Sequence, residues 1–357
     1  MSYNFTLYTE ALALLQTLIS IPSFSKAENL TADVIQEYFN IKDIPCHRNM
    51  NNIWARNKFY NAELPTILLN SHHDTVKPNQ GYSRNPFVHE IEDGKLYGLG
   101  SNDAGGCLVS LLATFCHFYA NENLRYNLIY SATAEEEISG QNGIELIYPL
   151  LGNMSFAIVG EPTQMNLAVA EKGLMVLDCV AHGKSGHAAR EEGINALYVA
   201  IDDINWFRTY QFERVSPFLG EIKMTATMIQ SGTQHNVVPD TCNFVVDVRI
   251  TDEYSHEEVL DIIKQNIKSK VTPRSLRSRS SSISLEHPIV KAGLALGRTT
   301  YGSPTSSDQA LLPITSIKIG PGDSARSHTA DEFIYIDEIQ DGIRLYIEML
   351  NQLLYEK

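Results

Sequence analysis

Short apolar segments that alternate with a helical pattern are the feature that most restricts how this chain can fold. Residues 66–69, 128–132 and 156–159 have the length and composition of buried strands, and a helical pattern at 107–119 lies between the first two. Buried strands separated by helices are typical of a parallel or mixed sheet with helices on its faces. Because ligands bind at the carboxyl ends of strands in such sheets, the residues that follow these segments are the first candidates for a functional site.

The pattern changes near residue 172, where a set of strands and helices typical of a small two-layer module begins. Its strand-like segments are 175–180, 224–229 and 244–250, and its helical segments are 195–207 and 255–267. We therefore predict an α/β fold in which a larger domain with a mostly parallel central sheet, residues 1–171 and 286–357, is interrupted by a smaller two-layer α/β domain, residues 172–285. The Lys-, Arg- and Ser-rich segment 264–282 is predicted to be a solvated loop that closes the smaller domain, the alternative being a basic patch.

Composition excludes several classes of protein. The 357 residues are enough for about two domains, and an apolar content of 43% is enough for folded cores. The 28 basic and 42 acidic residues give a net charge of −14, which is unfavourable for binding nucleic acid or an anionic membrane. The five cysteines contain no Cys-x-x-Cys pair, and the amino-terminal apolar stretch is short and lacks a basic start. We expect reduced cysteines and a cytoplasmic protein without a membrane segment.

Two glycine-rich segments resemble nucleotide-binding motifs but fail at a required position. Residues 98–103 begin like a dinucleotide fingerprint, yet Asp103 stands where the last glycine is needed and would repel a pyrophosphate. Residues 183–185 resemble the end of a phosphate-binding loop, but Asp178 occupies the position of its first glycine. A nucleotide-dependent enzyme is therefore disfavoured.

Histidines and carboxylates follow the apolar segments in an ordered series. They are His72 and Asp74, Asp103, the triplet at 135–137, Glu161 and His328. Taken singly, a Glu triplet is most often a solvated turn, and a His-x-Asp pair is most often a structural hydrogen bond. Five such positions at successive strand ends instead indicate a metal site, in which an aspartate can orient a ligand imidazole. Nitrogen and oxygen donors without thiolates suit zinc, with cobalt or manganese as possible substitutes.

These segments make the chain resemble the di-zinc amidohydrolase family that includes acetylornithine deacetylase, succinyl-diaminopimelate desuccinylase, aminoacylase and the glutamate carboxypeptidases. The resemblance extends over nearly the whole chain. The matching segments are 15–23, 71–76, 98–106, 133–137, 160–163, 183–187, 236–249 and 320–329.

The resemblance implies roles for individual residues of the larger domain. His72 and Glu161 correspond to ligands of one zinc, Glu137 and His328 to ligands of the other, and Asp103 to the carboxylate that bridges both. Asp74 corresponds to the residue that orients the His72 ring. Glu136 corresponds to the general base, which takes a proton from the attacking water and passes it to the leaving nitrogen. The family also has a cis peptide bond after the bridging aspartate.

The smaller domain corresponds to the lid of the family, which also forms the dimer contacts. His187 matches the histidine that reaches the neighbouring subunit's site and stabilises the oxyanion. Asn236 and Arg249 match groups that hold the substrate carboxylate, although Arg249 could equally pair with Asp247 or Asp240. Ser306 and Ser307, in a turn of the larger domain, are candidates for substrate contact or for plain loop structure.

The activity implied by the resemblance is hydrolysis of the amide of an N-acyl-L-amino acid by a homodimer. Within the family we favour an acetylornithine- or acetylcitrulline-deacetylase-like step of arginine biosynthesis, with a succinyl-diaminopimelate desuccinylase or a carboxypeptidase or dipeptidase as the alternative. A non-catalytic relative would be expected to lack Glu136 or a ligand, and this chain lacks neither. It departs from the family at Ser71 in place of a glycine, at 103–107, which lacks the lysine that many members have after the neighbour of the bridging aspartate, and at Glu135 in place of an aspartate. None of these changes removes a ligand.

Overall fold

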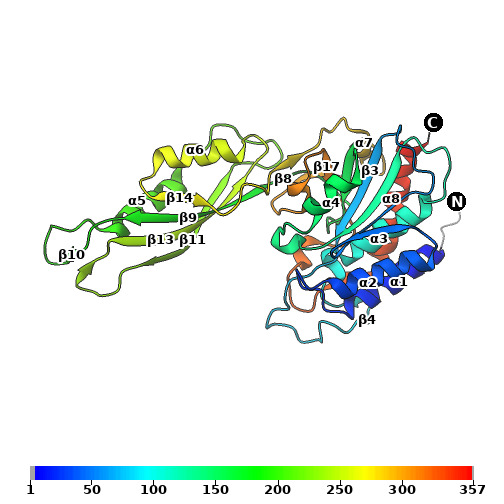
Figure 1. Ribbon diagram of the computed structural model, residues 1–357, viewed down its shortest axis with the longest axis horizontal. Helices are drawn as coiled ribbons and strands as arrows, with labels where there is room; N and C mark the ends of the chain where they lie inside the picture. Colours follow the sequence, from blue (N-terminus) through cyan, green and yellow to red (C-terminus); the bar gives the residue numbers. More distant parts are fainter. Residues whose placement is uncertain (1–4, 356–357) are drawn as a thin grey trace. The chain divides into compact units, whose positions relative to one another are not determined.

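The computed structural model describes residues 5–355 and divides into two compact units (Figure 1). The smaller unit consists of Ala170–Ser281 and Gly302–Ser306. The larger unit consists of the chain up to Val169 together with Ser282–Tyr301 and the residues from Ser307 onward. The smaller unit is thus inserted into the sequence of the larger one.

A nine-stranded sheet forms the centre of the larger unit. Its four middle strands are parallel, and the strands beside them on both sides pair antiparallel. The class predicted from the sequence, α/β with a mostly parallel central sheet, is therefore confirmed. In sheet order the strands are β1 (Cys46–Asn49), β2 (Asn52–Arg56), β6 (Asn127–Thr133), β3 (Thr66–His72), β7 (Phe156–Val159), β17 (Ser316–Lys318), β8 (Leu167–Glu171) and β15 (Ser281–Ser282), with β16 (Thr300–Ser303) also paired to β8.

Helices cover both faces of this sheet. Ile129 of β6 packs in one cluster with α4, whereas the next residue, Tyr130, contacts the aromatic rings of Phe39 and Phe115 on the opposite face. Strands β3 and β6 are buried at every position, which explains why they appear as unbroken apolar or small-residue segments in the sequence. The helices are α1 (Phe5–Ile19), α2 (Asn29–Ile41), α3 (Gly106–Phe118), α4 (Ile144–Leu151), α7 (Pro288–Ala295) and α8 (Ile336–Leu354).

A small three-stranded sheet lies beside the segment that carries His328. Its strands are β4 (Glu90–Glu92), β5 (Lys95–Tyr97) and β18 (Phe333–Tyr335). Strand β18 pairs antiparallel with β5, so that Phe333 lies opposite Tyr97. The pairing joins a segment near residue 100 to a segment near residue 330.

The smaller unit is a four-stranded antiparallel sheet that shares its core with two helices. Buried side chains alternate along β9, and residues of both helices belong to the same hydrophobic cluster as the sheet, for example Phe207 and Ile263. Its elements are β9 (Gly173–His182), α5 (Ala196–Thr209), β11 (Lys223–Ser231), β13 (Thr241–Ile250), α6 (His256–Asn266) and β14 (Lys270–Pro273), with β10 (Gly186–His187) and β12 (Val237–Val238) pairing separately. A capping box formed by Ser255 and Glu258 begins α6.

The prediction that residues 264–282 form a solvated loop was wrong in part. Residues Lys270–Pro273 form the edge strand β14, which pairs with β9 from Lys270 opposite Val180 to Pro273 opposite Leu177. Its side chains are exposed or only half-buried, so no apolar period marks the strand in the sequence. The pairing with a neighbouring strand, rather than a buried face, determines this structure.

Between residues 5 and 355, no helix combines the length and the apolar character needed to cross a membrane.

The core of the smaller unit gives a direct test of this architecture. Ile263 is fully buried on α6, and Ile263→Ala should lower the free energy of unfolding by roughly 3 kcal/mol because it leaves a cavity against the sheet. Urea denaturation followed by the fluorescence of Trp206, which lies in the same unit, measures the change in a Trp54→Phe background. The matched control is Gln265→Ala on the exposed side of the same helix, which should change the stability by less than about 0.5 kcal/mol. Equal effects of the two changes would contradict the described packing.

Candidate metal centre

The candidate ligands come from loops at the carboxyl ends of the parallel strands. His72 ends β3, Glu137 lies in a short 3-10 turn (Glu136–Ile138) after β6, and Glu161 follows β7 by two residues. Asp103 lies in the turn Ser101–Gly105 that leads into α3, and the expected cis peptide bond between Asp103 and Ala104 is present. Segments far apart in the sequence therefore meet at one edge of the sheet, as expected for this class of fold.

The side chains form two groups that share one carboxylate. His72, Asp103 and Glu161 make up the first group, and Asp103, Glu137 and His328 make up the second, with the ligand atoms of each group within 4.8 Å of one another. His72 Nε2 lies 3.3 Å from Asp103 Oδ1 and 3.6 Å from Glu161 Oε1. His328 Nε2 lies 2.9 Å from Glu137 Oε2 and 3.7 Å from Asp103 Oδ2. The structure thus brings all five predicted ligands together, with Asp103 between the two groups.

Burial and charge perturb the protonation of these groups. Burial alone would lower the pKa of His72, but the charge of Glu136 and hydrogen bonds with Asp103 and Asp74 raise it well above its usual value. The hydrogen bond with Glu137 raises the pKa of His328 to about 9. Burial, together with neighbouring carboxylates such as Glu161, raises the pKa of Glu136 well above its usual value, although His72 opposes this. In the metal-free protein, the protonated imidazoles therefore supply positive charge that partly offsets the carboxylates.

The donor set fits a pair of divalent cations. Each group offers one imidazole nitrogen and carboxylate oxygens, with no thiolate, and Asp103 offers one oxygen to each group. Shared carboxylates and imidazoles suit zinc, cobalt or manganese. Without a cation, several carboxylates in a mostly buried space would repel one another, which is the electrostatic signature of a metal site.

The side chains of the triplet Glu135–Glu137 point in two directions. The carboxylate of Glu135 accepts a hydrogen bond from Asn142 Nδ2 at 2.8 Å, so this side chain is engaged away from the ligands. Glu136 Oε2 lies 3.8 Å from His72 Nε2, while Glu137 contacts His328. Because Glu135 has a left-handed backbone (φ 56°), the chain turns sharply there and directs the next two side chains towards the centre.

Asp74 supports both His72 and the Glu triplet. The Nδ1 atom of His72 lies 3.0 Å from the carbonyl oxygen of Asp74 and 3.5 Å from its Oδ1. The same carboxylate accepts hydrogen bonds from the backbone N–H groups of Glu136 at 3.1 Å and Glu137 at 3.2 Å. Asp74 therefore links the loop after β3 to the loop after β6, a contact that the sequence alone did not indicate.

The structure places His187 and Asn236 together in the smaller unit and Arg249 apart from them. His187 is exposed on β10, and Asn236 lies just before the paired strand β12, where its carbonyl accepts the N–H of Ala188. Arg249 lies near the other end of β13, eight residues beyond Thr241, which corresponds to about 26 Å of strand. Its guanidinium pairs with Asp247 through two hydrogen bonds of 2.8 and 3.1 Å, one of the alternatives left open by the sequence.

The two serines expected in one turn of the larger domain have different surroundings. Ser306 belongs to the smaller unit, and its hydroxyl donates to the carbonyl of Lys172 at 3.0 Å. Ser307 belongs to the larger unit, where it is buried and caps a 3-10 turn by accepting the N–H of Gln309. The expectation that both serines lie in the larger domain was therefore wrong for Ser306.

The sequence analysis assigned no role in holding the centre together to three buried carboxylates that lie near it. Glu28 accepts the backbone N–H of Glu135, and Asp308 accepts hydrogen bonds from Asn70 and Thr133 at the ends of β3 and β6. Glu332 accepts backbone N–H groups of the turn that carries Asp103, and burial together with the charge of Asp103 raises its pKa to about 8. No strand end or motif marks these positions, so only the folded structure identifies them.

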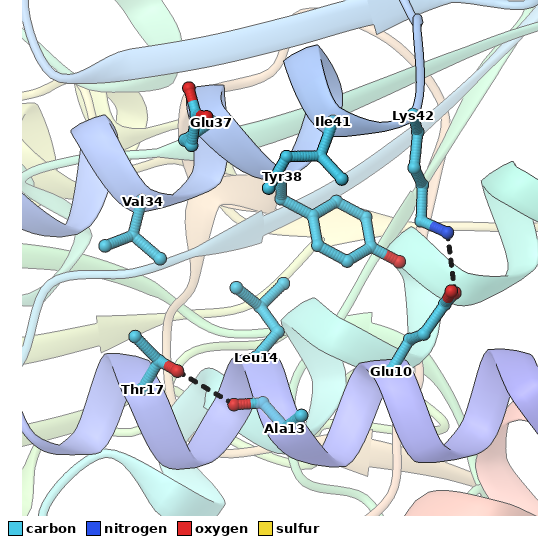
Figure 2. A pocket seen from close by; sticks show the side chains of 9 residues that line it. All are labelled: Glu10, Ala13, Leu14, Thr17, Val34, Glu37, Tyr38, Ile41 and Lys42. Carbon is cyan, nitrogen blue, oxygen red and sulfur yellow. Dashed lines mark hydrogen bonds and ion pairs between the residues drawn. The ribbon is translucent and has the colours of Figure 1, made fainter.

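A separate pocket of about 380 Å³ lies between α1 and α2 (Figure 2). One ion pair, between Lys42 and Glu10 at 2.6 Å, lies at its edge. No candidate metal ligand is among the described residues that line it, which are Glu10, Ala13, Leu14, Thr17, Val34, Glu37, Tyr38, Ile41 and Lys42. The candidate metal ligands therefore lie at the carboxyl ends of the parallel strands and not in this pocket.

Comparisons with known proteins agree with this fold. The chain is 23% identical over 378 residues to succinyl-diaminopimelate desuccinylase of Caulobacter sp. (strain K31), covering 96% of each protein. It is 24% identical to acetylornithine deacetylase of Buchnera aphidicola subsp. Schizaphis graminum, covering 95% of this chain and 97% of that protein. The structure of Bacillus subtilis YXEP, described as a dinuclear metal-binding peptidase, superimposes with a TM-score of 0.73 at 14% identity, covering 97% of this chain and 98% of that one.

Together the paired ligand groups and the shared carboxylate form a candidate dinuclear metal site at the ends of the parallel strands. The model of Peptidase family M20/M25/M40 matches residues 68–352, and the chain belongs to this family. It is therefore a hydrolase of the amidohydrolase and peptidase type, and the family resemblance inferred from the sequence is confirmed.

The protonation of His328 predicts a pH dependence of metal binding. A metal ligand must be a neutral imidazole, and the pKa of His328 is about 9, so binding at pH 7 must release its proton. The apparent affinity should therefore rise with pH below about 9 and level off above it. Calorimetric titration of the metal-free protein with Zn²⁺ at pH 7, in two buffers of different ionisation enthalpy, should show release of at least one proton. A His117→Ala control, outside the ligand groups, should release the same number, and the absence of proton release would contradict the assignment.

Proposed function

We propose that this protein is a zinc-dependent deacylase that hydrolyses the amide bond of N-acyl-L-amino acids. The observation that carries the proposal is the pair of ligand groups that share Asp103, with Glu136 beside them and not belonging to either group. His72 and Glu161 would hold one ion, Glu137 and His328 the other, and Asp103 both. When bound, the two ions would act as Lewis acids that polarise the scissile carbonyl and acidify water.

Glu136 is the general base of the proposed reaction. Its carboxylate lies among the ligands, 3.8 Å from His72 Nε2, and its side chain is largely shielded from solvent. It takes a proton from the water that attacks the carbonyl carbon, and it returns the proton to the nitrogen as the C–N bond breaks. The products are a free carboxylate and an amine. Asp74 keeps Glu136 in place by accepting its backbone N–H.

The two relatives above support N-acyl amino acids as the substrate class. One is named for removing an acetyl group from ornithine and the other for removing a succinyl group from diaminopimelate. We favour an acetylornithine- or acetylcitrulline-deacetylase-like reaction, which would place the enzyme in arginine biosynthesis. Because the identity to both relatives is 23–24%, desuccinylation is the alternative, followed by a carboxypeptidase or dipeptidase activity.

A panel of substrates tests the proposal. Release of free amine should be measured with the zinc-loaded protein on acetyl-, succinyl- and formyl-amino acids and on dipeptides. Turnover of acetylated ornithine or citrulline above the other compounds would support the favoured reaction. Preference for a succinylated amino acid would support the alternative, and cleavage of dipeptides alone would contradict a deacylase.

We propose that the active form is a homodimer joined through the smaller unit. Strand β11 forms an edge of its sheet, and within the described residues no strand pairs with its outer side. Its side chains Met228 and Ile229 are 65% and 52% exposed, and Tyr198 on the adjoining helix α5 is 66% exposed. An open edge with apolar side chains favours pairing with the same strand of a second copy.

The separation between His187 and Arg249 also supports a dimer. About 26 Å of strand lies between the β10 end and the Arg249 end of β13, so the two side chains of one unit are too far apart to hold a single small substrate. If both contact the substrate, they come from different copies. In this arrangement His187 of one copy donates to the developing oxyanion at the other copy's site, and Arg249, released from Asp247, binds the carboxylate.

Glu136→Gln should reduce turnover by about 10²-fold or more, because the amide keeps the volume of the side chain but cannot accept the proton. Metal content, measured by elemental analysis, should remain at the wild-type level. The matched control is Glu135→Gln, which retains an oxygen to accept from Asn142 and should change turnover little. If Glu135→Gln proved the more damaging change and Glu136→Gln were nearly fully active, the base would be Glu135.

His187→Ala should reduce turnover by about 10²-fold, the scale of one lost oxyanion donor, and leave metal binding unchanged. The contribution of one copy to the other's site is tested by mixing this variant with Glu136→Gln under conditions that allow subunit exchange. Each mixed dimer then has one site with both intact residues, so activity should reappear. If mixing restores nothing although mixed dimers form, His187 acts within its own chain.

A further inference from the structure

Glu332 is a buried carboxylate that none of the proposed catalytic steps uses. It is 1% exposed and directly precedes β18. The pairing of β18 with β5 continues into a hydrogen bond from the N–H of Gly98 to the carbonyl of Glu332 at 3.0 Å. The backbone of Glu332 is therefore fixed against the segment that leads into the turn of Asp103.

The side chain of Glu332 accepts hydrogen bonds from three backbone N–H groups of that turn. Its Oε1 accepts the N–H of Asn102 at 2.8 Å and that of Asp103 at 2.9 Å, and its Oε2 accepts the N–H of Gly100 at 3.1 Å. The N–H of Asp103 belongs to the very residue whose side chain is shared by the two ligand groups.

The segment that contains Glu332 also carries a ligand. His328 lies four residues before Glu332, and between them Asp331 accepts the N–H groups of Ser83 and Arg84, each at 2.9 Å. The turn of Asp103 is held from another side as well, because the side chain of Asn102 exchanges two hydrogen bonds of 3.0 Å with the backbone of Asp323. One short segment thus anchors itself to a neighbouring loop, supplies His328 and holds the Asp103 turn.

We propose that Glu332 is a positioning residue for the dinuclear centre: its carboxylate fixes the turn so that the two oxygens of Asp103 face the two ligand groups. The inference rests on the proposed metal centre and adds a residue to it. A small rotation of the turn would move both Asp103 oxygens at once, so loss of Glu332 weakens both metal sites together. A carboxylate that only stabilised the fold would not have this effect.

Titration of the metal-free protein with Co²⁺ tests the inference, with the visible absorption of each bound ion and competition by a chelator as the readouts. The wild type should bind two ions, and Asp103→Ala should lose both. Glu332→Ala should weaken both sites by about 10- to 100-fold, the scale known for partners that orient metal ligands. Glu332→Gln retains one oxygen able to accept the N–H groups of Asn102 and Asp103, so its loss should be smaller.

A matched control separates positioning from general stability. Asp203 is a buried carboxylate of the smaller unit that accepts the N–H groups of Lys268 at 3.1 Å and Ser269 at 2.8 Å. Asp203→Asn should lower the melting temperature and leave the Co²⁺ titration unchanged. Hydrogen exchange of residues 98–106 gives a local readout, and it should speed up in both Glu332 variants and not in the control.

The outcomes distinguish this inference from the metal centre on which it rests. If the wild type binds two ions and folded Glu332→Ala or Glu332→Gln binds them equally well, the positioning role is overturned while the centre stands. Weakening of only one site would also overturn it, because Asp103 serves both groups. If the wild type binds no ions, or if Asp103→Ala retains two, the metal centre itself is wrong.

Discussion

An excess of buried negative charge at one edge of the sheet is the constraint on which the rest of the structure depends. Two imidazoles share this space with the carboxylates of Asp74, Asp103, Glu136, Glu137 and Glu161. Two like charges 4 Å apart repel by about 4 kcal/mol at an effective dielectric constant of about 20. A fold that gathers so many carboxylates is stable only where cations, protons or oriented dipoles offset the repulsion.

The carboxylates around the centre fall into two kinds according to what offsets their charge. Asp103, Glu137 and Glu161 face the ligand groups and are suited to cations. Asp74, Glu28 and Glu332 instead accept peptide N–H groups from the loops that carry the ligands. Through these hydrogen bonds, the carboxylates of the second kind hold in place the loops that carry ligands of the first kind. Pre-organised ligands of this type bind metals tightly because little freedom is lost on binding.

The sequence predicted the parts of the structure that leave a local pattern. The apolar segments gave β3, β6 and β7, and the rule that ligands gather at strand ends indicated one metal site from His72, Asp103, the triplet at 135–137, Glu161 and His328. Helix α8 likewise leaves a continuous apolar stripe in the sequence. The division of these residues between two metal ions, with Asp103 shared and Glu136 as the base, came in contrast from the family resemblance.

What escaped prediction depends on contacts between distant segments. Glu332 bonds to residues about 230 positions earlier, so nothing in its own neighbourhood distinguishes it from a surface glutamate. Strand β14 forms because its backbone pairs with β9, and not because it has an apolar face of its own. The pairing of Arg249 with Asp247 was one of two equal alternatives, because residues two apart on a strand share a face whatever their role.

The insertion of the smaller unit also orders events during synthesis on the ribosome. Its two ends lie in the neighbouring strands β8 and β15, and all strands of its own sheet emerge before β17 does. Because domains fold as units as they emerge, the insert can complete its core while the larger sheet still lacks a strand next to β7. His328 emerges later still. The nascent chain can therefore complete the smaller unit before the candidate ligand His328 has emerged.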